Sequence, residues 1–216
     1  YPGDEFSMTG TVAPFTTANG YYLAGSYLSG KVVDSVGGGI CQVSTTLYNA
    51  ILLAELDVTE RYNHSMIVHY VDVSADAAIA ESAGKDFKFV NSLDYPVYIE
   101  GSTSADKNIT FTVYGVETRP ASRSLRFESK VLSYTEPGPE VIVADAGQPI
   151  GYVSVQSSYP GYKAELWKIV MENGVEKERI QINSSSYKMV PRTATVGVAS
   201  ADGNAYNEIM AAIGTG

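Results

Sequence analysis

The chain of 216 residues has one cysteine, Cys41, followed by two histidines, His64 and His69. A thiolate nucleophile needs a base that can take up its proton. A cysteine at the start of a helix, followed by a histidine on a later strand, is the chain order of papain-like and transglutaminase-like cysteine enzymes. We therefore predict that Cys41 is a nucleophile. With a single cysteine, no internal disulfide can form.

The segment from Cys41 to Leu56 has the pattern of an amphipathic helix. It lacks Gly and Pro, and apolar residues recur at helical spacing, at Val43, Leu47, Ile51 and Ala54. The triplet 37–39 is all glycine, so the helix is predicted to begin near Cys41. Free N–H groups of the first turn favour a thiolate and, with Gln42, could hold an oxyanion. The alternative is that Cys41 is a small buried hydrophobic residue that begins a core helix.

Residues 65–73 alternate in polarity, which predicts a half-buried strand with His64 at its entrance and His69 inside it with the opposite parity. We predict His64 as the general base, although each histidine could instead be an ordinary strand residue. A third polar group should orient the imidazole. The candidates are Asp76, Asp86 and Asn91, and we favour Asp86 or Asp76, between which the spacing does not choose. We predict no metal and no cofactor, because no metal-ligand spacing is present.

Three further segments, 87–90, 96–100 and 109–114, have the pattern of strands. Residues 1–118 are therefore predicted to form an α+β domain in which the Cys41 helix packs on an antiparallel sheet, with a papain-like or transglutaminase-like fold as one option. A polar linker is predicted over 119–126. Residues 119–199 are predicted to form a small all-β domain, in which Asn173-Gly174 closes a hairpin. The tail, 200–216, is predicted to be either a helix or disordered.

The net charge of −9 lies entirely in the first half, where residues 1–118 hold five basic and fourteen acidic side chains. An acidic surface repels phosphate backbones, which argues against a nucleic-acid partner. No run of eighteen apolar residues is present, so we predict no membrane contact by this segment. Because the chain begins at Tyr1 rather than at a methionine, it is expected to be part of a longer protein whose leader or anchor has been removed.

Residues 37–50, GGGICQVSTTLYNA, resemble the signature of the VanW family, whose members occur alongside vancomycin resistance and in many Gram-positive envelopes. Further matches extend the resemblance over residues 1–116, in the segments 2–7, 60–61, 64–65, 76–77, 86–91 and 114–115. The second half resembles the G-five domain, a glycine-marked β module of cell-wall proteins, through the turns at 137–138, 147, 151 and 173–174 and the segment 187–197.

The VanW resemblance implies an extracytoplasmic protein at the cell wall, with peptidoglycan or its peptides or glycans as partner. The family pattern retains Cys41 and His64, whereas His69 falls outside it. Residues predicted to contact substrate are Gly38, Gly39, Ser44, Arg61 and Asn91. In the second half, the aromatic side chains either form platforms for sugar rings or are ordinary sheet residues; they are Trp167, Tyr152, Tyr159, Tyr162 and Tyr187.

Two hypotheses follow. In the first, the protein is a cysteine-dependent hydrolase or transferase that acts on peptide or amide bonds of peptidoglycan. In the second, it is a non-catalytic module that binds peptidoglycan or glycan, and Cys41 only shapes a pocket. The reactivity of Cys41 distinguishes them, because only an activated thiol reacts much faster than a free one. The sequence gives no indication of the oligomeric state.

Overall fold

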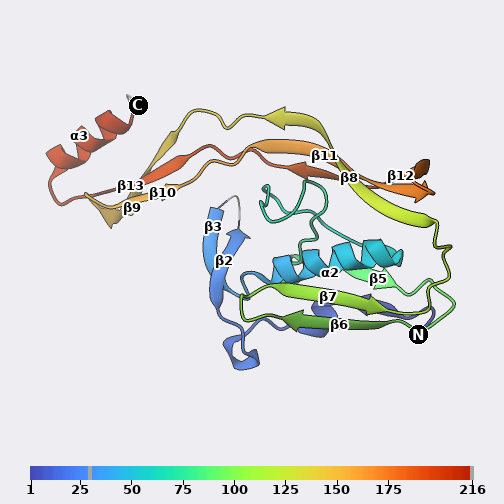
Figure 1. Cartoon of the computed structure of the whole chain (residues 1–216). Helices are drawn as coiled ribbons and strands as arrows, with labels where there is room; N and C mark the ends of the chain where they lie inside the picture. The colour runs from blue at the N-terminus through green and yellow to red at the C-terminus, as the bar shows by residue number, and fades with distance from the viewer. Residues whose placement is uncertain (29–30, 215–216) are drawn as a thin grey trace.

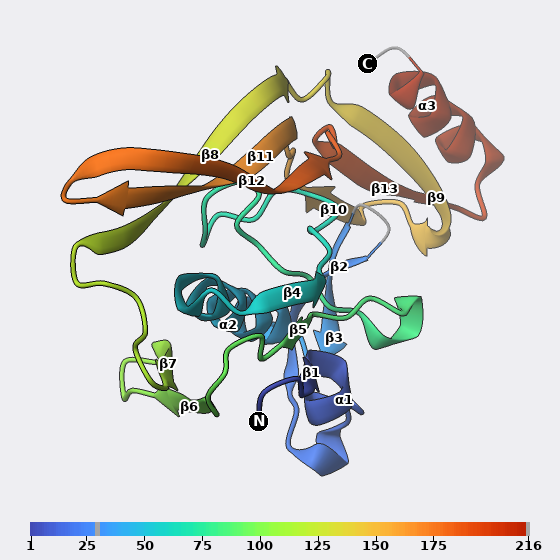
Figure 2. The ribbon, with the colours of Figure 1, turned by 90° about the vertical axis from the view of Figure 1, so that its right-hand side faces the viewer.

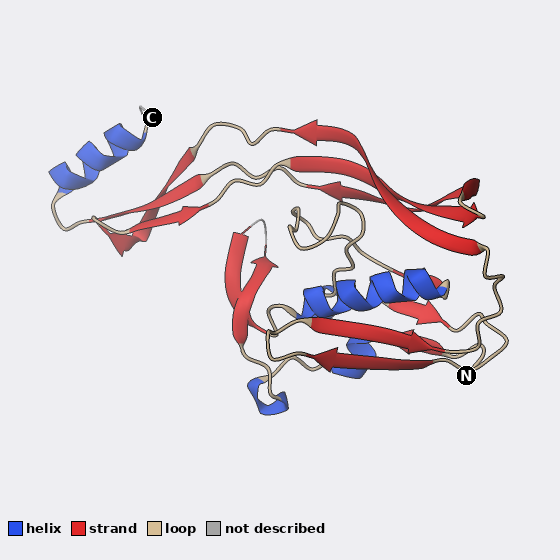
Figure 3. Ribbon diagram, in the orientation of Figure 1, coloured by secondary structure: helices blue, strands red, loops and turns tan. Residues whose placement is uncertain are grey.

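The computed structural model describes residues 1–28 and 31–214, which form mostly strands with few helices (Figures 1 and 3). The first half contains, in chain order, β1 (Glu5–Ser7), α1 (Met8–Val12), η1 (Thr17–Asn19), β2 (Leu23–Leu28), β3 (Lys31–Val36), α2 (Ile40–Ala54), β4 (Asp57–Glu60), η2 (Glu81–Ala83), β5 (Lys88–Val90), β6 (Tyr98–Thr103) and β7 (Ile109–Tyr114). The second half contains β8 (Arg123–Thr135), β9 (Val141–Pro149), β10 (Val153–Gln156), β11 (Gly161–Glu172), β12 (Val175–Tyr187), β13 (Thr193–Ala199) and α3 (Gly203–Ile213).

Helix α2 begins at Ile40, so the helix predicted near Cys41 is confirmed. Gly39 caps it in the left-handed conformation, with φ +89°, which glycine adopts without strain. The helix ends at Glu55, which is also left-handed and whose backbone N–H bonds the carbonyls of the last turn. Its buried stripe is apolar apart from Ser44 and Thr45, and consists further of Leu47, Tyr48, Ile51 and Leu52.

Antiparallel sheets pack against α2 in the first half. Strands β6 and β7 form a hairpin beside the helix, and β5 pairs with β1 on one side and β4 on the other. Phe87 and Phe89 around β5 join the α2 stripe in one hydrophobic cluster. The prediction of a helix on an antiparallel sheet is therefore confirmed in this coarse form, and three of the predicted strands correspond to β5, β6 and β7. A papain-like or transglutaminase-like fold is not established.

The strand predicted over residues 65–73 is wrong, because residues 61–80 form an irregular loop whose only pairings are isolated bridges, between Tyr62 and Ala78 and between Ala80 and Lys85. Three successive side chains of this loop, Met66, Ile67 and Val68, are all buried, whereas a strand buries alternate residues. The loop is instead held by a residue of the second half, because the backbone N–H of Lys188 donates to the Ser65 carbonyl at 2.8 Å. Contacts with residues distant in sequence replace the strand-to-strand hydrogen bonds that the alternating polarity of residues 65–73 predicted.

Two three-stranded sheets make up the second half. Strands β8, β11 and β12 form an antiparallel sheet, and β13 lies between β10 and β9, antiparallel to the first and parallel to the second. The predicted hairpin at Asn173-Gly174 is confirmed, and both residues have positive φ, +51° and +78°, as a type I′ turn requires. The tail forms helix α3, capped by Asp202; residues 215–216 lie outside the described part.

The β8–β11–β12 sheet lies over the first half, with the loop 61–80 between this sheet and α2 (Figure 2). Leu166 of β11 belongs to the same hydrophobic cluster as the α2 stripe, and Phe127 and Ile182 pack against it. The predicted linker over 119–126 is shorter than expected, because β8 starts at Arg123. The two halves therefore share buried surface, and side chains of the second half reach residues near Cys41.

Candidate functional site

Cys41 is the second residue of α2, and the glycine triplet before it explains its placement. Gly37 and Gly39 both have positive φ, so larger residues would be strained there. Gly38 packs on β2 so closely that a Cβ would lie 2.1 Å from the Ala24 carbonyl oxygen. The triplet thus turns the chain sharply and fixes the hairpin β2–β3 next to the helix start. The Cys41 side chain is half-buried, and its thiol bonds the Ile79 carbonyl at 3.4 Å.

His64 lies across from Cys41, at the start of the irregular loop, and is 8% exposed. Its Nδ1 atom is 2.7 Å from Oδ2 of Asp76, and its backbone N–H donates to the same oxygen at 2.7 Å. Burial alone would lower the pKa of His64. The hydrogen bond that Asp76 accepts from the ring, the interaction with Cys41 and the charges of both groups outweigh burial and raise this pKa to about 9. The imidazole therefore lies between a carboxylate and the thiol.

Asp76 has no exposed surface. Its Oδ1 atom accepts hydrogen bonds from Nη2 of Arg61, at 2.8 Å, and from the hydroxyl of Tyr187. Burial would raise the pKa of Asp76, but the hydrogen bond with His64, the Arg61 charge and the Tyr187 hydroxyl hold it below its usual value. A buried carboxylate satisfied in this way stays ionised and fixes the ring that it contacts.

The first half of the chain, residues 1–114, matches the family described as "VanW like protein". This chain belongs to the VanW-like family. Over 99 residues, this VanW-like chain is 39% identical to the uncharacterized protein YoaR of Bacillus subtilis (strain 168). The match covers 46% of this chain and 32% of YoaR, so the chain spans about a third of that relative.

Part of the VanW-like chain is similar to two solved G5 domains. One belongs to an IgA1 protease, with 22% identity, a TM-score of 0.23, and coverage of 36% of this chain and 94% of that one. The other is HP0197-G5, with 21% identity, a TM-score of 0.18, and coverage of 35% and 95%. No helix among the described residues of the VanW-like chain is both long and apolar enough to cross a bilayer.

Of the residues that could orient His64, the structure brings only Asp76 into contact with it. Asp86, just before β5, contacts the start of α1. Its carboxylate accepts hydrogen bonds from the Ser7 hydroxyl at 2.5 Å and the Thr9 backbone N–H at 2.8 Å. Asn91 closes a local turn, through its bond to the Tyr95 carbonyl. Asp86 and Asn91 therefore have structural roles away from Cys41.

Only some of the residues predicted to contact substrate are exposed near Cys41. Gly39 is exposed beside Cys41, and Gln42 is exposed on the first turn of α2. Ser44 has no exposed surface, and Arg61 donates its side-chain hydrogen bonds within the protein. Gly38 is packed against β2. Because Ser44 is buried, Arg61 is bonded internally and Asn91 closes a turn, we do not assign these three residues to substrate binding. Arg61 instead supplies the positive charge that balances Asp76.

Aromatic side chains that the sequence did not identify surround His64. The hydroxyl of Tyr70 lies 3.4 Å from Nε2 of His64, and the rings of Tyr27 and Tyr70 meet the imidazole edge-on. Tyr27 also contacts Tyr159 of the second half, whose ring stacks with exposed His69 at 6.4 Å between centroids. No local sequence signal marks Tyr27 and Tyr70, because sixteen tyrosines are spread over the chain.

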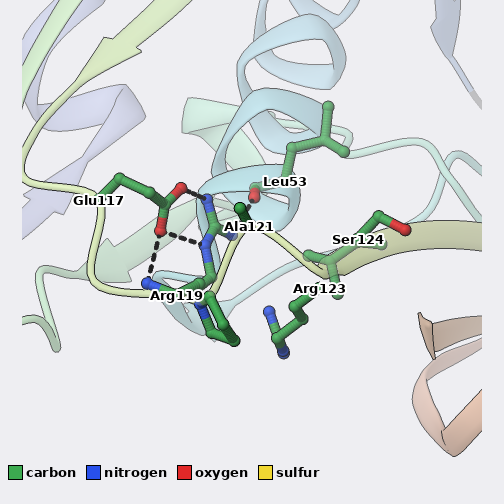
Figure 4. Close-up of a pocket in the computed structure, with 8 residues that line it drawn as sticks. Leu53, Glu117, Arg119, Ala121, Arg123 and Ser124 are labelled. Carbon is green, nitrogen blue, oxygen red and sulfur yellow. Dashed lines mark hydrogen bonds and ion pairs between the residues drawn. The ribbon is translucent and has the colours of Figure 1, made fainter. Parts of the chain in front are cut away.

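Two cavities lie at the other end of α2, away from Cys41. The smaller, of about 240 Å³, is lined by Leu53 and by the segment from Glu117 to Leu125, as Figure 4 shows. The larger, of about 610 Å³, lies between α2 and β7. Arg119 and Arg123 at the smaller cavity are paired with Glu117 and Glu55. No group of three potential metal-ligating side chains occurs among residues 1–28 and 31–214.

Proposed function

We propose that this VanW-like protein is a cell-envelope enzyme in which Cys41 attacks a carbonyl carbon of a peptide or amide bond in peptidoglycan. The observation that carries the proposal is that His64 bonds the buried Asp76 through Nδ1 and lies close enough to the Cys41 thiol for the thiol to raise its pKa. Nucleophile, base and orienting carboxylate in this order constitute the arrangement of cysteine and serine acyl-transfer enzymes on unrelated folds. The envelope location and the peptidoglycan substrate rest on the family resemblance.

The proposed reaction has two balanced steps. Because its pKa is raised to about 9, His64 carries the proton near neutral pH and pairs with Cys41 as the thiolate. The thiolate adds to the carbonyl carbon, and the tetrahedral intermediate then expels the amine, which receives the proton from His64 and leaves a thioester on Cys41. Water attacks the thioester in hydrolysis, or an amine attacks it in transfer, and His64 again moves the proton. The N–H groups of Ile40 and Gln42 at the start of α2 donate to the carbonyls of Gly37 and Gly39, so an oxyanion in the proposed reaction has to use other donors of this turn.

Asp76 supports both steps through charge and orientation. Its bond to Nδ1 leaves Nε2, which lies 3.4 Å from the Tyr70 hydroxyl, for the proton transfers of the proposed reaction, and its negative charge stabilises the imidazolium. Arg61 and Tyr187 keep this carboxylate ionised although it is buried. The acid–base pair therefore has the electrostatic environment that the proposed chemistry requires.

The direct test is to treat purified cell wall with the protein and with the Cys41→Ala variant, and to compare the released muropeptides by mass spectrometry. We expect a product of cleavage or transfer only with the wild-type protein. Cys41→Ser serves as a matched control that keeps the side-chain shape but weakens the nucleophile. Identical muropeptide profiles for wild type and Cys41→Ala would refute the enzymatic proposal for this substrate.

A second candidate function is a non-catalytic module that binds wall glycan. The aromatic group of Tyr27, Tyr70, Tyr159 and His69 favours it, because such rings can stack on sugar faces. This candidate predicts that Cys41→Ala binds purified wall as tightly as wild type, whereas Tyr159→Ala binds less. If the Cys41→Ala variant neither binds wall nor differs from wild type in muropeptide release, both candidates fail for this substrate.

A further inference from the structure

Strand β12 carries a row of polar side chains on the face that lies against the loop 61–80. The row consists of Asn183, Ser185 and Tyr187, which alternate along the strand and therefore point to the same side. Ser185 and Tyr187 are buried. A strand face that covers a core is normally apolar, because a buried polar group is costly unless it is hydrogen-bonded. The row is accordingly matched to a polar surface on the loop.

The row holds the backbone of the loop at Ser74, two residues before Asp76. The Ser74 backbone N–H donates to the Tyr187 hydroxyl at 2.8 Å, and the Ser74 hydroxyl lies 2.6 Å from both Asn183 Oδ1 and Ser185 Oγ. Ser74 has φ +71°, a conformation that a serine rarely adopts without support. The contacts with β12 supply that support, and they fix the backbone just before Asp76.

The same row reaches the charged groups behind His64. The Tyr187 hydroxyl donates to Oδ1 of Asp76, while the other oxygen, Oδ2, contacts His64. Ser185 accepts a hydrogen bond at 2.9 Å from Arg61, which also pairs with Oδ1. Both members of the Arg61–Asp76 pair are thus anchored to β12. The rotation of the carboxylate, and with it the position of the imidazole, depends on a strand of the second half.

We propose that Tyr187, supported by Asn183 and Ser185, is a positioning residue for Asp76 and His64, so that the Cys41 site of the first half is complete only with β12 in place. This inference rests on the proposed function. Several titratable or charged groups surround His64 and Asp76 and must be considered in any pH profile. They are Cys41 from α2, Tyr27 from β2, Arg61 and Tyr70 from the loop, and Tyr187 from β12.

The test compares Tyr187→Phe with Tyr162→Phe in the full chain. Tyr162 is the register partner of Tyr187 on β11, and the same substitution there leaves the Asp76 contacts intact. Two quantities are measured from pH 5 to 10: the rate of Cys41 alkylation by iodoacetamide, and the titration of His64 by NMR, with His69→Gln to assign the signals. Asp76→Asn provides the profile expected when the carboxylate is lost.

We expect Tyr187→Phe to slow alkylation at pH 7 about fivefold, the equivalent of one net hydrogen bond. We also expect the His64 midpoint to move down by roughly one pH unit toward the Asp76→Asn profile, because a freely rotating carboxylate holds the imidazolium less well. Tyr162→Phe should match wild type. If Tyr187→Phe also matches wild type in both measurements, the positioning role is refuted.

The failure of the proposed function has a different signature. In that case wild-type Cys41 reacts no faster than a free thiol and Asp76→Asn does not change its rate, while the His64 titration still decides whether Tyr187 positions the pair. If Tyr187→Phe does not fold, Ser185→Ala replaces it, since this variant removes the hydrogen-bond acceptor of Arg61. A lowered His64 midpoint in Ser185→Ala supports the inference, and an unchanged midpoint overturns it.

Discussion

The two ends of helix α2 each place a carboxylate among groups of the second half, yet only one end has the elements of a reactive site. Near the start of α2, Asp76 contacts His64, and His64 contacts Cys41. At the other end, Glu55 bonds Arg119, Arg123 and Lys168. Arginine and lysine side chains stay charged near neutral pH. None of these three partners can therefore exchange a proton with Glu55 near neutrality.

This difference teaches that an ion-paired carboxylate alone does not identify a functional site in this protein. Both carboxylates have a lowered pKa, and in Glu55 it falls to about 2, mainly through its hydrogen bond with Arg123. What distinguishes Asp76 is a titratable ring beside a nucleophile. The Glu55 cluster instead joins the end of α2 to the beginning of β8 and to β11, which is a structural role.

The largest effect is expected for Asp76→Asn. This substitution leaves Arg61 buried without its counter-ion, so the free energy of unfolding should fall by about 3 to 5 kcal/mol. Urea denaturation followed by tryptophan fluorescence measures the loss. The matched substitution at the other end of α2, Glu55→Gln, should cost much less. An equal or larger loss for Glu55→Gln would contradict the comparison.

The next largest effect concerns reactivity. His64→Ala should slow alkylation of Cys41 at pH 7 about 100-fold, because the thiol loses its base. His69→Ala is the control, since His69 is exposed and stacks with Tyr159 rather than with the site. Stopped assays with iodoacetamide and mass spectrometry give both rates. Equal slowing in the two variants would show that the choice between the histidines is wrong.

A smaller effect is expected from Glu55→Gln itself, about 1 kcal/mol in the free energy of unfolding, because the cluster is partly open to solvent. Its alkylation rate should equal that of wild type, since Glu55 is at the far end of the helix. A slowed Cys41 in this variant would mean that the two ends of α2 are coupled.

The smallest and most selective effects are in the pH dependence of stability. The Glu55 pKa is lowered, so its contribution is present above the unfolded value of 4.5 and is lost as pH falls toward about 2. The His64 pKa is raised, so its contribution is complete below 6.5 and disappears as pH rises through about 9. The stability difference between wild type and Glu55→Gln, measured by thermal unfolding, should change with pH only in the first window, and that between wild type and His64→Ala only in the second. A shared window would contradict the separate origins.

Local patterns in the sequence were sufficient for the parts of the fold that depend on local chemistry. The glycine triplet and the apolar spacing predict α2 to within two residues at each end, and Asn173-Gly174 predicts its hairpin. The strand predicted over residues 65–73 is wrong, because the loop 61–80 that contains them is held by contacts with β12 and β2, which lie far away in sequence. Its alternation of polarity therefore carried no information about pairing.

The candidate site shows the same division. Cys41 and His64 could be proposed from residue type and order alone, but Asp76 could not be separated from Asp86, since only the folded loop decides which carboxylate meets the imidazole. Arg61 was assigned to substrate, although it is the counter-ion of Asp76. The polar row of β12 was missed because alternate polar residues on a strand usually indicate a solvent-exposed face.

The most direct measurement for the central claim is the rate of Cys41 alkylation by iodoacetamide in the wild-type protein at pH 6 and pH 8. A free thiol slows on the order of 100-fold between pH 8 and pH 6, because its thiolate disappears. With His64 and Asp76 stabilising an ion pair, we predict that Cys41 slows less than about fivefold over this interval. A decline as steep as that of glutathione would show that the imidazole does not activate the thiol, and the catalytic account would be abandoned.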